Sequence, residues 1–246
     1  MTMQNRKDEV WKSPLTVERY LTGVRRAVPL AAEQIEVMMR LISATRKPVT
    51  NFLDLGCGDG ILSAAILEKY PESRGVLLDF SSPMIEAARE KLRDYASNLD
   101  FMTLDYTSSY WLDSISKIAP FDVIVSGFSI HHQPDRKKQE LYGEIYSLLK
   151  PGGIFLNIEH VSSPTRWIEY VFEEYFINSL YDMYLAEGSQ KTRSQVVEEF
   201  RNRSDKEVNI LAPIETQCDW LRRIGFTDVD CYFKVFELAV FGGRRP

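Results

Sequence analysis

Residues 52–60 read Phe52-Leu53-Asp54-Leu55-Gly56-Cys57-Gly58-Asp59-Gly60, an apolar run that ends in three closely spaced glycines. The apolar run is typical of a buried strand, and residues 61–70 carry apolar side chains at helical spacing. The glycines therefore lie on a tight turn from a strand to a helix. Glycine allows left-handed backbone angles and lets a ligand approach the main chain. The free N–H groups of the following helix favour a polar or anionic group in the same space.

Four further short apolar runs follow, and each is β-branched or aromatic and ends in a polar residue. They cover residues 75–79, 100–105, 121–126 and 153–159. Such runs are typical of parallel strands buried on both faces, and ligands bind beyond the carboxyl ends of such strands. Asp79 lies about 20 residues beyond the glycines, where a doubly wound nucleotide fold places a carboxylate on ribose hydroxyls. We therefore expect Asp79, Asp105 and Ser126 to line one crevice.

The order of these motifs resembles that of class I S-adenosylmethionine-dependent methyltransferases. The resemblance rests on residues 54–60, Asp79, Asp105, Leu148-Leu149-Lys150-Pro151-Gly152-Gly153 and residues 221–226. It implies an α/β fold with a Rossmann-like, seven-stranded, mostly parallel doubly wound sheet and an antiparallel C-terminal edge. It also implies S-adenosyl-L-methionine as the cofactor. A nicotinamide dehydrogenase would more often place the third glycine one residue later.

The chain of 246 residues is 44% hydrophobic, which suits one domain with an ample core. We expect residues 1–47 to form an N-terminal helical cap, 48–160 the cofactor-binding core, 161–213 a helical lid insertion, and 214–246 a C-terminal helix and strand pair. Within the cap, we expect a frayed start over residues 1–13, then helices over 15–29 and 30–46. The aromatic insertion either docks as a helical pair or forms a lid that builds the acceptor pocket.

The charge and cysteine content limit the function classes. A net charge of −5 argues against a general nucleic-acid surface. The three cysteines are far apart, which indicates a reducing compartment without a disulfide framework or metal cluster. We find no apolar run typical of a signal peptide or long enough to cross a membrane, so we expect a cytoplasmic enzyme. A homodimer is compatible with these features.

The resemblance implies a role for each polar position at the crevice. The expected cofactor-binding residues are Asp54, Gly56, Cys57, Gly58, Gly60, Asp79, Phe80, Met84, Asp105, Tyr106, Ser126 and Gly127. Asp54 and the glycine turn would hold the amino-acid end, and Asp79 the ribose. Asp105 would accept from the adenine amine, with Phe80, Met84 and Tyr106 nearby. Ser126 and Gly127 would lie behind the sulfonium.

All three histidines fall near the expected crevice, at positions 131, 132 and 160. For a hydroxyl acceptor, we expect His131 or His160 to take the proton, because an imidazole titrates near neutral pH. We expect His132 to turn toward the following loop. No metal site is expected, because adjacent histidines rarely aim both rings at one ion.

The chemistry that the resemblance implies is in-line methyl transfer to the oxygen or nitrogen of a small or medium organic acceptor. A narrower likeness leads to carboxy-S-adenosylmethionine synthase, a relative that prepares the cofactor for wobble-uridine modification of tRNA. It rests on Arg25-Arg26-Ala27-Val28-Pro29, Ile214-Glu215-Thr216 and Tyr232-Phe233-Lys234-Val235-Phe236.

The synthase family has an arginine that binds a carboxylate, and the likeness places it near Arg201 or Arg203 of this chain. Ala31 stands where that family has a tyrosine, and the glycine turn lacks the family's serine near Cys57-Gly58. The pattern therefore favours a plain methyltransferase. The synthase activity and a non-catalytic S-adenosylmethionine-binding role remain as alternatives. Arg25 and Arg26, at the bend of the cap, meet either a ligand carboxylate or solvent.

Overall fold

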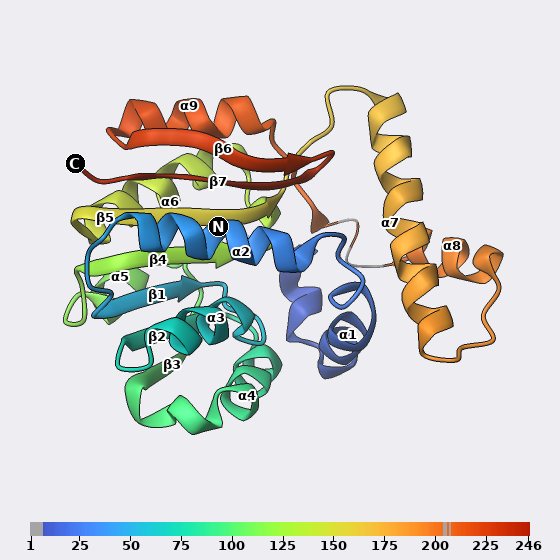
Figure 1. Ribbon diagram of the computed structural model, residues 1–246, viewed down its shortest axis with the longest axis horizontal. Coiled ribbons are helices and arrows are strands. Elements are labelled where there is room, and N and C mark those ends of the chain that lie inside the picture. Colours follow the sequence, from blue (N-terminus) through green and yellow to red (C-terminus); the bar gives the residue numbers. More distant parts are fainter. Residues whose placement is uncertain (1–6, 204–205, 207) are drawn as a thin grey trace, which may run out of the picture.

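A computed structural model describes residues 7–203, 206 and 208–246 (Figure 1). These residues form one sheet in the order β3-β2-β1-β4-β5-β7-β6. The strands are β1 (Asn51–Leu55), β2 (Arg74–Asp79), β3 (Leu99–Thr103), β4 (Phe121–Gly127), β5 (Leu149–His160), β6 (Thr227–Val235) and β7 (Leu238–Arg244). Only β7 breaks the parallel order among these strands, since it runs antiparallel to both β5 and β6. The predicted seven-stranded Rossmann-like sheet with an antiparallel C-terminal edge is confirmed.

Helices cover both faces of the sheet (Figure 1). The α-helices in the described part of the chain are α1 (Pro14–Arg19), α2 (Ala31–Ala44), α3 (Ile61–Lys69), α4 (Ser82–Lys91), α5 (Trp111–Ile115), α6 (Asp135–Leu148), α7 (Arg166–Ala186), α8 (Arg193–Arg201) and α9 (Ile214–Ile224). Leu53 and Leu55 of β1 pack with α5, α6 and α9, whereas Phe52 packs with α2, α3 and α4. Because side chains alternate along a strand, Asp54 faces the same side as Phe52.

The N-terminal segment is more ordered than expected. Residues 7–13 are not frayed: Lys7–Lys12 form the short 3₁₀ helix η1, and Trp11 is 8% exposed. Its carbonyl accepts a hydrogen bond of 2.6 Å from Ser81 Oγ. The helix expected over 15–29 is α1 continued by the π-helical turn η2 (Tyr20–Val24). Periodicity does not reveal such tertiary contacts.

The insertion consists of α7 and α8, and α7 stands beside the sheet rather than on its face (Figure 1). Its aromatic side chains are divided between core and surface. Phe172 and Phe176 are buried with Ala27 and Val28 of the N-terminal segment, whereas Trp167 is 72% exposed. The insertion therefore docks on the N-terminal segment through part of its aromatic face.

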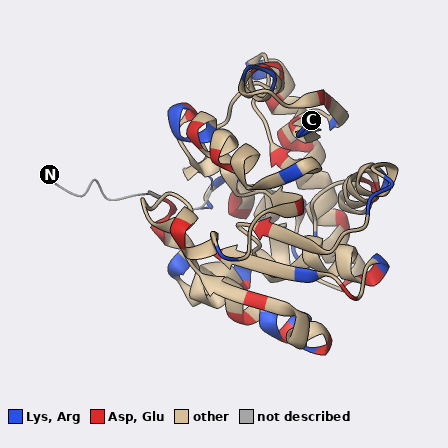
Figure 2. Cartoon of the chain, turned by 90° about the vertical axis from the view of Figure 1, so that its left-hand side faces the viewer, with Lys and Arg blue, Asp and Glu red and all other residues tan. Residues whose placement is uncertain are grey.

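Acidic and basic side chains are interspersed over the helices (Figure 2). Many of them form local ion pairs, such as Arg193 with Glu174 at 2.6 Å. In the part of the chain that the structure describes, no helix combines the length and the apolar character needed to cross a bilayer.

Candidate active site

A cavity of about 140 Å³ lies where β1, β2, β4 and β5 end, and we call it the main cavity. Its walls come from three parts of the chain. The residues that line it are Trp11, Tyr20, Val24, Val28, Gly56, Gly58, Asp79, Phe80, Met84, Gly127, Phe128, Ser129, His131, His132, His160, Phe172, Phe176, Phe200, Arg203, Asn209 and Leu238. The glycine turn, the acid of β2 and all three histidines thus meet at one site, as expected from the strand ends.

A smaller cavity of about 40 Å³ adjoins it beside the glycine turn, and we call it the side cavity. The two cavities share Tyr20, Gly58, Gly127 and Phe128 as lining residues. The side cavity is also lined by Arg25, Ala31, Gln34, Ile35, Asp54, Cys57, Asp59, Ile61, Leu62 and Ile158. The structure therefore divides eight of the twelve expected cofactor-binding residues between two adjoining spaces.

The glycine turn is needed both for backbone angles and for space. Gly56 has a φ of 69°, and a Cβ there would lie 1.9 Å from Ser129 Oγ. The turn leaves the main chain at Gly56 and Gly58 open to the main cavity. Gly60 lines neither cavity; a Cβ there would lie 2.8 Å from Leu92 Cδ1, so its role is packing.

Asp79 faces the main cavity at the end of β2 and is 7% exposed. Its Oδ2 accepts from the N–H of Gly58 at 2.9 Å, and its Oδ1 accepts from the N–H of Ser81 at 2.8 Å. Burial raises its pKa to about 6, against the effect of these hydrogen bonds. The carboxylate is thus fixed in orientation beside Phe80 and Met84, which also line the cavity. The side chain of Ser81 caps the helix that follows.

Three other expected cofactor residues lie behind the cavity walls. Asp105 Oδ1 accepts from Thr107 N at 2.8 Å and from Thr107 Oγ1 at 2.7 Å, so it organises its own loop. Tyr106 is buried and donates its hydroxyl to Ser129 O at 3.1 Å. Ser126 is fully buried and donates to Leu55 O at 2.7 Å. None of the three is among the residues that line the two cavities.

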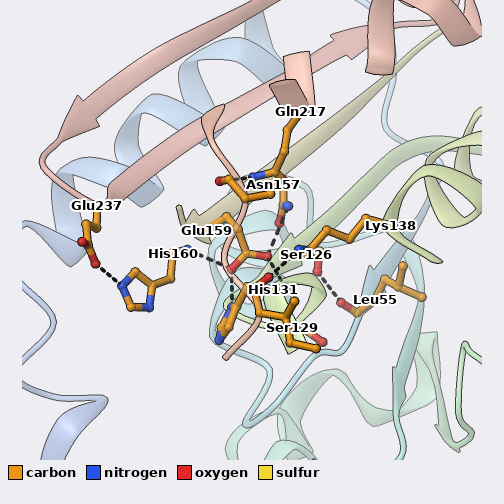
Figure 3. Close-up of polar contacts among 12 residues, drawn as sticks. Leu55, Ser126, Ser129, His131, Lys138, Asn157, Glu159, His160, Gln217 and Glu237 are labelled. Atoms are coloured by element: carbon orange, nitrogen blue, oxygen red, sulfur yellow. Dashed lines mark hydrogen bonds and ion pairs between the residues drawn. The ribbon is translucent and has the colours of Figure 1, made fainter. Parts of the chain in front are cut away.

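His131 lies against a buried carboxylate (Figure 3). Its Nδ1 is 2.5 Å from Glu159 Oε1, and Glu159 also accepts from the backbone N–H of His131 at 3.0 Å and of His160 at 2.9 Å. A carboxylate with several donors places the ring proton on Nδ1 and leaves Nε2 as the acceptor. Burial holds the pKa of His131 well below its usual value, so the ring is neutral near pH 7.

His160 has a carboxylate partner of its own, since its Nε2 is 2.7 Å from Glu237 Oε2 (Figure 3). Its ring centroid lies 5.8 Å from that of His131. His132 also lines the main cavity, which contradicts the expectation that it turns toward the following loop. Burial lowers the pKa of His132 to about 3.

Four residues of the site were not predicted from the sequence as site residues. Trp11 and Asn209 line the main cavity. Glu159 and Glu237 line neither cavity but bind the rings of His131 and His160, respectively. Of the two arginines left open by the narrower likeness, Arg203 lines the main cavity, with its guanidinium carbon 4.4 Å from the centre of the Phe200 ring. Arg201 instead pairs with Glu173 at 3.3 Å on the outside.

The two cavities fit an adenosyl amino acid. Asp79 offers a fixed acceptor for ribose hydroxyls, and Phe80 and Met84 offer apolar contacts for a flat base. Asp54 is fully buried beside the side cavity, and its Oδ1 has no hydrogen-bond partner, so that atom remains available to a donor.

Comparison with known proteins agrees with a site for an adenosyl amino acid. Residues 52–153 match the family described as "Methyltransferase domain". The chain is similar to the carboxy-S-adenosyl-L-methionine synthase of Campylobacter lari, with 25% identity over 96% of this chain and 98% of that protein. It is also similar to malonyl-[acyl-carrier protein] O-methyltransferase 1 of Ilyobacter polytropus, with 37% identity over 42% of this chain and 35% of that protein.

Among solved structures, "PigF with SAH" has a TM-score of 0.60 and 18% identity, and the match covers 99% of this chain. It covers 63% of that solved chain, so this chain spans less than two thirds of its length. A likeness at this identity concerns the fold.

Proposed function

Because this chain carries a class I S-adenosylmethionine-dependent methyltransferase domain, we propose that it carboxylates the cofactor, as a carboxy-S-adenosylmethionine synthase does by its name. The sequence pattern favours a plain methyltransferase, but the relatives support the alternative better. Two synthases match 96% and 99% of this chain, whereas the malonyl-[acyl-carrier protein] O-methyltransferase matches only 42%.

The observation that carries the proposal is the position of Arg203. Its side chain lines the main cavity together with His131 and the aromatic residues Phe172, Phe176 and Phe200. A planar guanidinium matches a carboxylate in geometry and charge, and such a pair is strong where water is excluded. An acceptor pocket for an uncharged aromatic molecule would not need an arginine in its wall.

The proposed reaction replaces one hydrogen of the cofactor's S-methyl group by a carboxylate. S-adenosylmethionine supplies a sulfonium that makes this methyl group acidic. In the protein, Nε2 of neutral His131 accepts the proton, and Glu159 holds the ring in the tautomer that this requires. Carbon dioxide takes the place of that proton, so that one C–H bond breaks and one C–C bond forms, and Arg203 binds the resulting carboxylate. The aromatic wall excludes water.

A second candidate is methyl transfer to a hydroxyl or amine of a small or medium organic acceptor. The apolar wall of Phe172, Phe176 and Phe200 favours it, because those rings suit an organic substrate. In that reaction, His131 would accept the proton of the acceptor.

Mass spectrometry of the ligand that copurifies with the protein tests the proposal. We expect an adenosyl ligand heavier than S-adenosylmethionine by the mass of carbon dioxide. Arg203→Met should weaken binding of this ligand at least about tenfold relative to plain S-adenosylmethionine, the scale of one charge-assisted hydrogen bond. Arg201→Met is the matched control, and its affinities should not change. A plain cofactor together with methylation of a small acceptor would favour the second candidate, and binding without turnover would leave a non-catalytic role.

Replacement of the histidines tests the proposed base. His131→Gln should lower turnover about 10²–10⁴-fold, the usual contribution of a general base. His160→Gln should lower it less, because Glu237 already occupies its Nε2. Melting temperatures of both variants separate a catalytic from a structural effect. Turnover within a few-fold of the wild type for both variants would show that neither histidine is the base.

A further inference from the structure

Two residues that line the side cavity each carry a buried acceptor atom without a hydrogen-bond partner. These atoms are Oδ1 of Asp54 and Oε1 of Gln34. Asp54 is fully buried, and Gln34 is 1% exposed. A buried acceptor without a donor lowers stability, so native proteins rarely keep one unless a ligand or water supplies the donor. Here the two residues that carry such atoms line the same small space.

Both side chains are held so that the unpartnered atom stays in place. Asp54 Oδ2 accepts from the hydroxyl of Ser63 at 2.7 Å and from its N–H at 3.2 Å. Gln34 Nε2 donates to the carbonyl of Pro29 at 2.9 Å. Because a carbonyl only accepts, this bond fixes the amide nitrogen on Pro29 and leaves the oxygen for another donor. The acceptors are therefore preorganised.

The chemistry of the side cavity selects the kind of group that fits. Two acceptors, one of them a carboxylate in a space of about 40 Å³, suit a small cation with several N–H donors, which is a primary ammonium. Arg25 lines the same cavity and offers a guanidinium. Its neighbour Arg26 instead pairs with Glu187 at 2.5 Å. An ammonium next to a carboxylate is the head of an α-amino acid.

We infer that Gln34 and Asp54 bind the ammonium, and Arg25 the carboxylate, of the methionyl end of S-adenosylmethionine. Asp54 comes from the core, but Gln34 and Arg25 come from the N-terminal segment, which lies outside the matched methyltransferase region of residues 52–153. That segment therefore supplies two of the three residues of the amino-acid site. The inference rests on the cofactor of the domain and does not depend on whether a methyl or a carboxyl group is transferred.

Calorimetry with three ligands tests the inference without turnover. They are S-adenosylhomocysteine, its analogue without the amino group, and its analogue without the carboxylate. Gln34→Met should weaken the two amine-bearing ligands about tenfold and leave the deaminated analogue unchanged. Arg25→Met should weaken the two carboxylate-bearing ligands by a similar factor and spare the decarboxylated analogue.

Two matched controls separate recognition from stability. Gln217→Met replaces a buried glutamine on the opposite face of the sheet, whose amide oxygen accepts from Tyr142 and whose amide nitrogen donates to Ala212. Arg26→Met replaces the arginine next to Arg25. Neither should change the ranking of the ligands. If Gln34→Met does not fold, Asp54→Asn tests the same ammonium contact with an isosteric side chain. Equal losses for all three ligands, or no loss, would overturn the inference and leave an ordered water as the occupant.

Discussion

At the scale of single residues, burial changes the pKa values of the acidic side chains in the site. Asp54, Asp79 and Glu159 are carboxylates with little or no exposed surface, and burial raises the pKa of each. For Asp54, the pKa rises to about 7, although Ser63 donates two hydrogen bonds to it. The ligand-free site is thus poised to lose a proton when a cationic group enters.

This predicts a pH dependence of cofactor binding. Below pH about 7, Asp54 holds a proton that it must release to pair with an ammonium, so the affinity for S-adenosylhomocysteine should fall by up to about tenfold per pH unit. Above that pH, the affinity should level off. Asp79, with a pKa of about 6, changes the affinity with the same sign at lower pH.

Calorimetry in two buffers of different ionisation enthalpy measures both the affinity and the proton released. Asp54→Asn should remove the step near pH 7 and keep the one near pH 6. An affinity that stays flat over this range in the wild type would contradict the assignment of Asp54 to a cationic partner.

At the scale of elements, the insertion of α7 and α8 closes the outer side of the main cavity through Phe172, Phe176 and Phe200. We predict that these helices act as a lid. Their amides should exchange hydrogen faster in the ligand-free protein than in the complex with cofactor and acceptor, because ligands add contacts to these rings. Equal protection from hydrogen exchange with and without ligands, measured by mass spectrometry, would show that the insertion is a fixed wall and not a lid. The helix α6, which does not line the cavity, serves as the internal reference.

The sequence predicts best those elements whose own pattern of apolar residues determines their secondary structure. The strands β1, β2, β3, β4 and β5 were located from continuous apolar runs, because burial on both faces requires such runs. The N-terminal helix η1 was missed, because its order depends on Trp11 contacting Ser81, 70 residues away. The pairing of His131 with Glu159 depends on the register of β4 on β5, which aligns Gly127 with Ile158. Local patterns do not contain that register.

At the scale of the whole molecule, the site lies where three parts of the chain meet. The core supplies the glycine turn, Asp79 and the histidines, the N-terminal segment supplies Trp11 and Gln34, and the insertion supplies Arg203. The last two parts also pack on each other, since Val28 lies in one apolar cluster with Phe172. A ligand that fills both cavities therefore links all three parts, and each stabilises the others.

The outer wall has a consequence for how such a protein changes over generations. Phe172, Phe176, Phe200, Arg203 and Asn209 all lie outside residues 52–153, the region shared with methyltransferases in general. On the proposed function, substitutions in these five residues should reshape the space for the second substrate and leave the glycine turn untouched. On the proposed function, we therefore expect that substrate preference can change through substitutions in this one segment while cofactor use is retained.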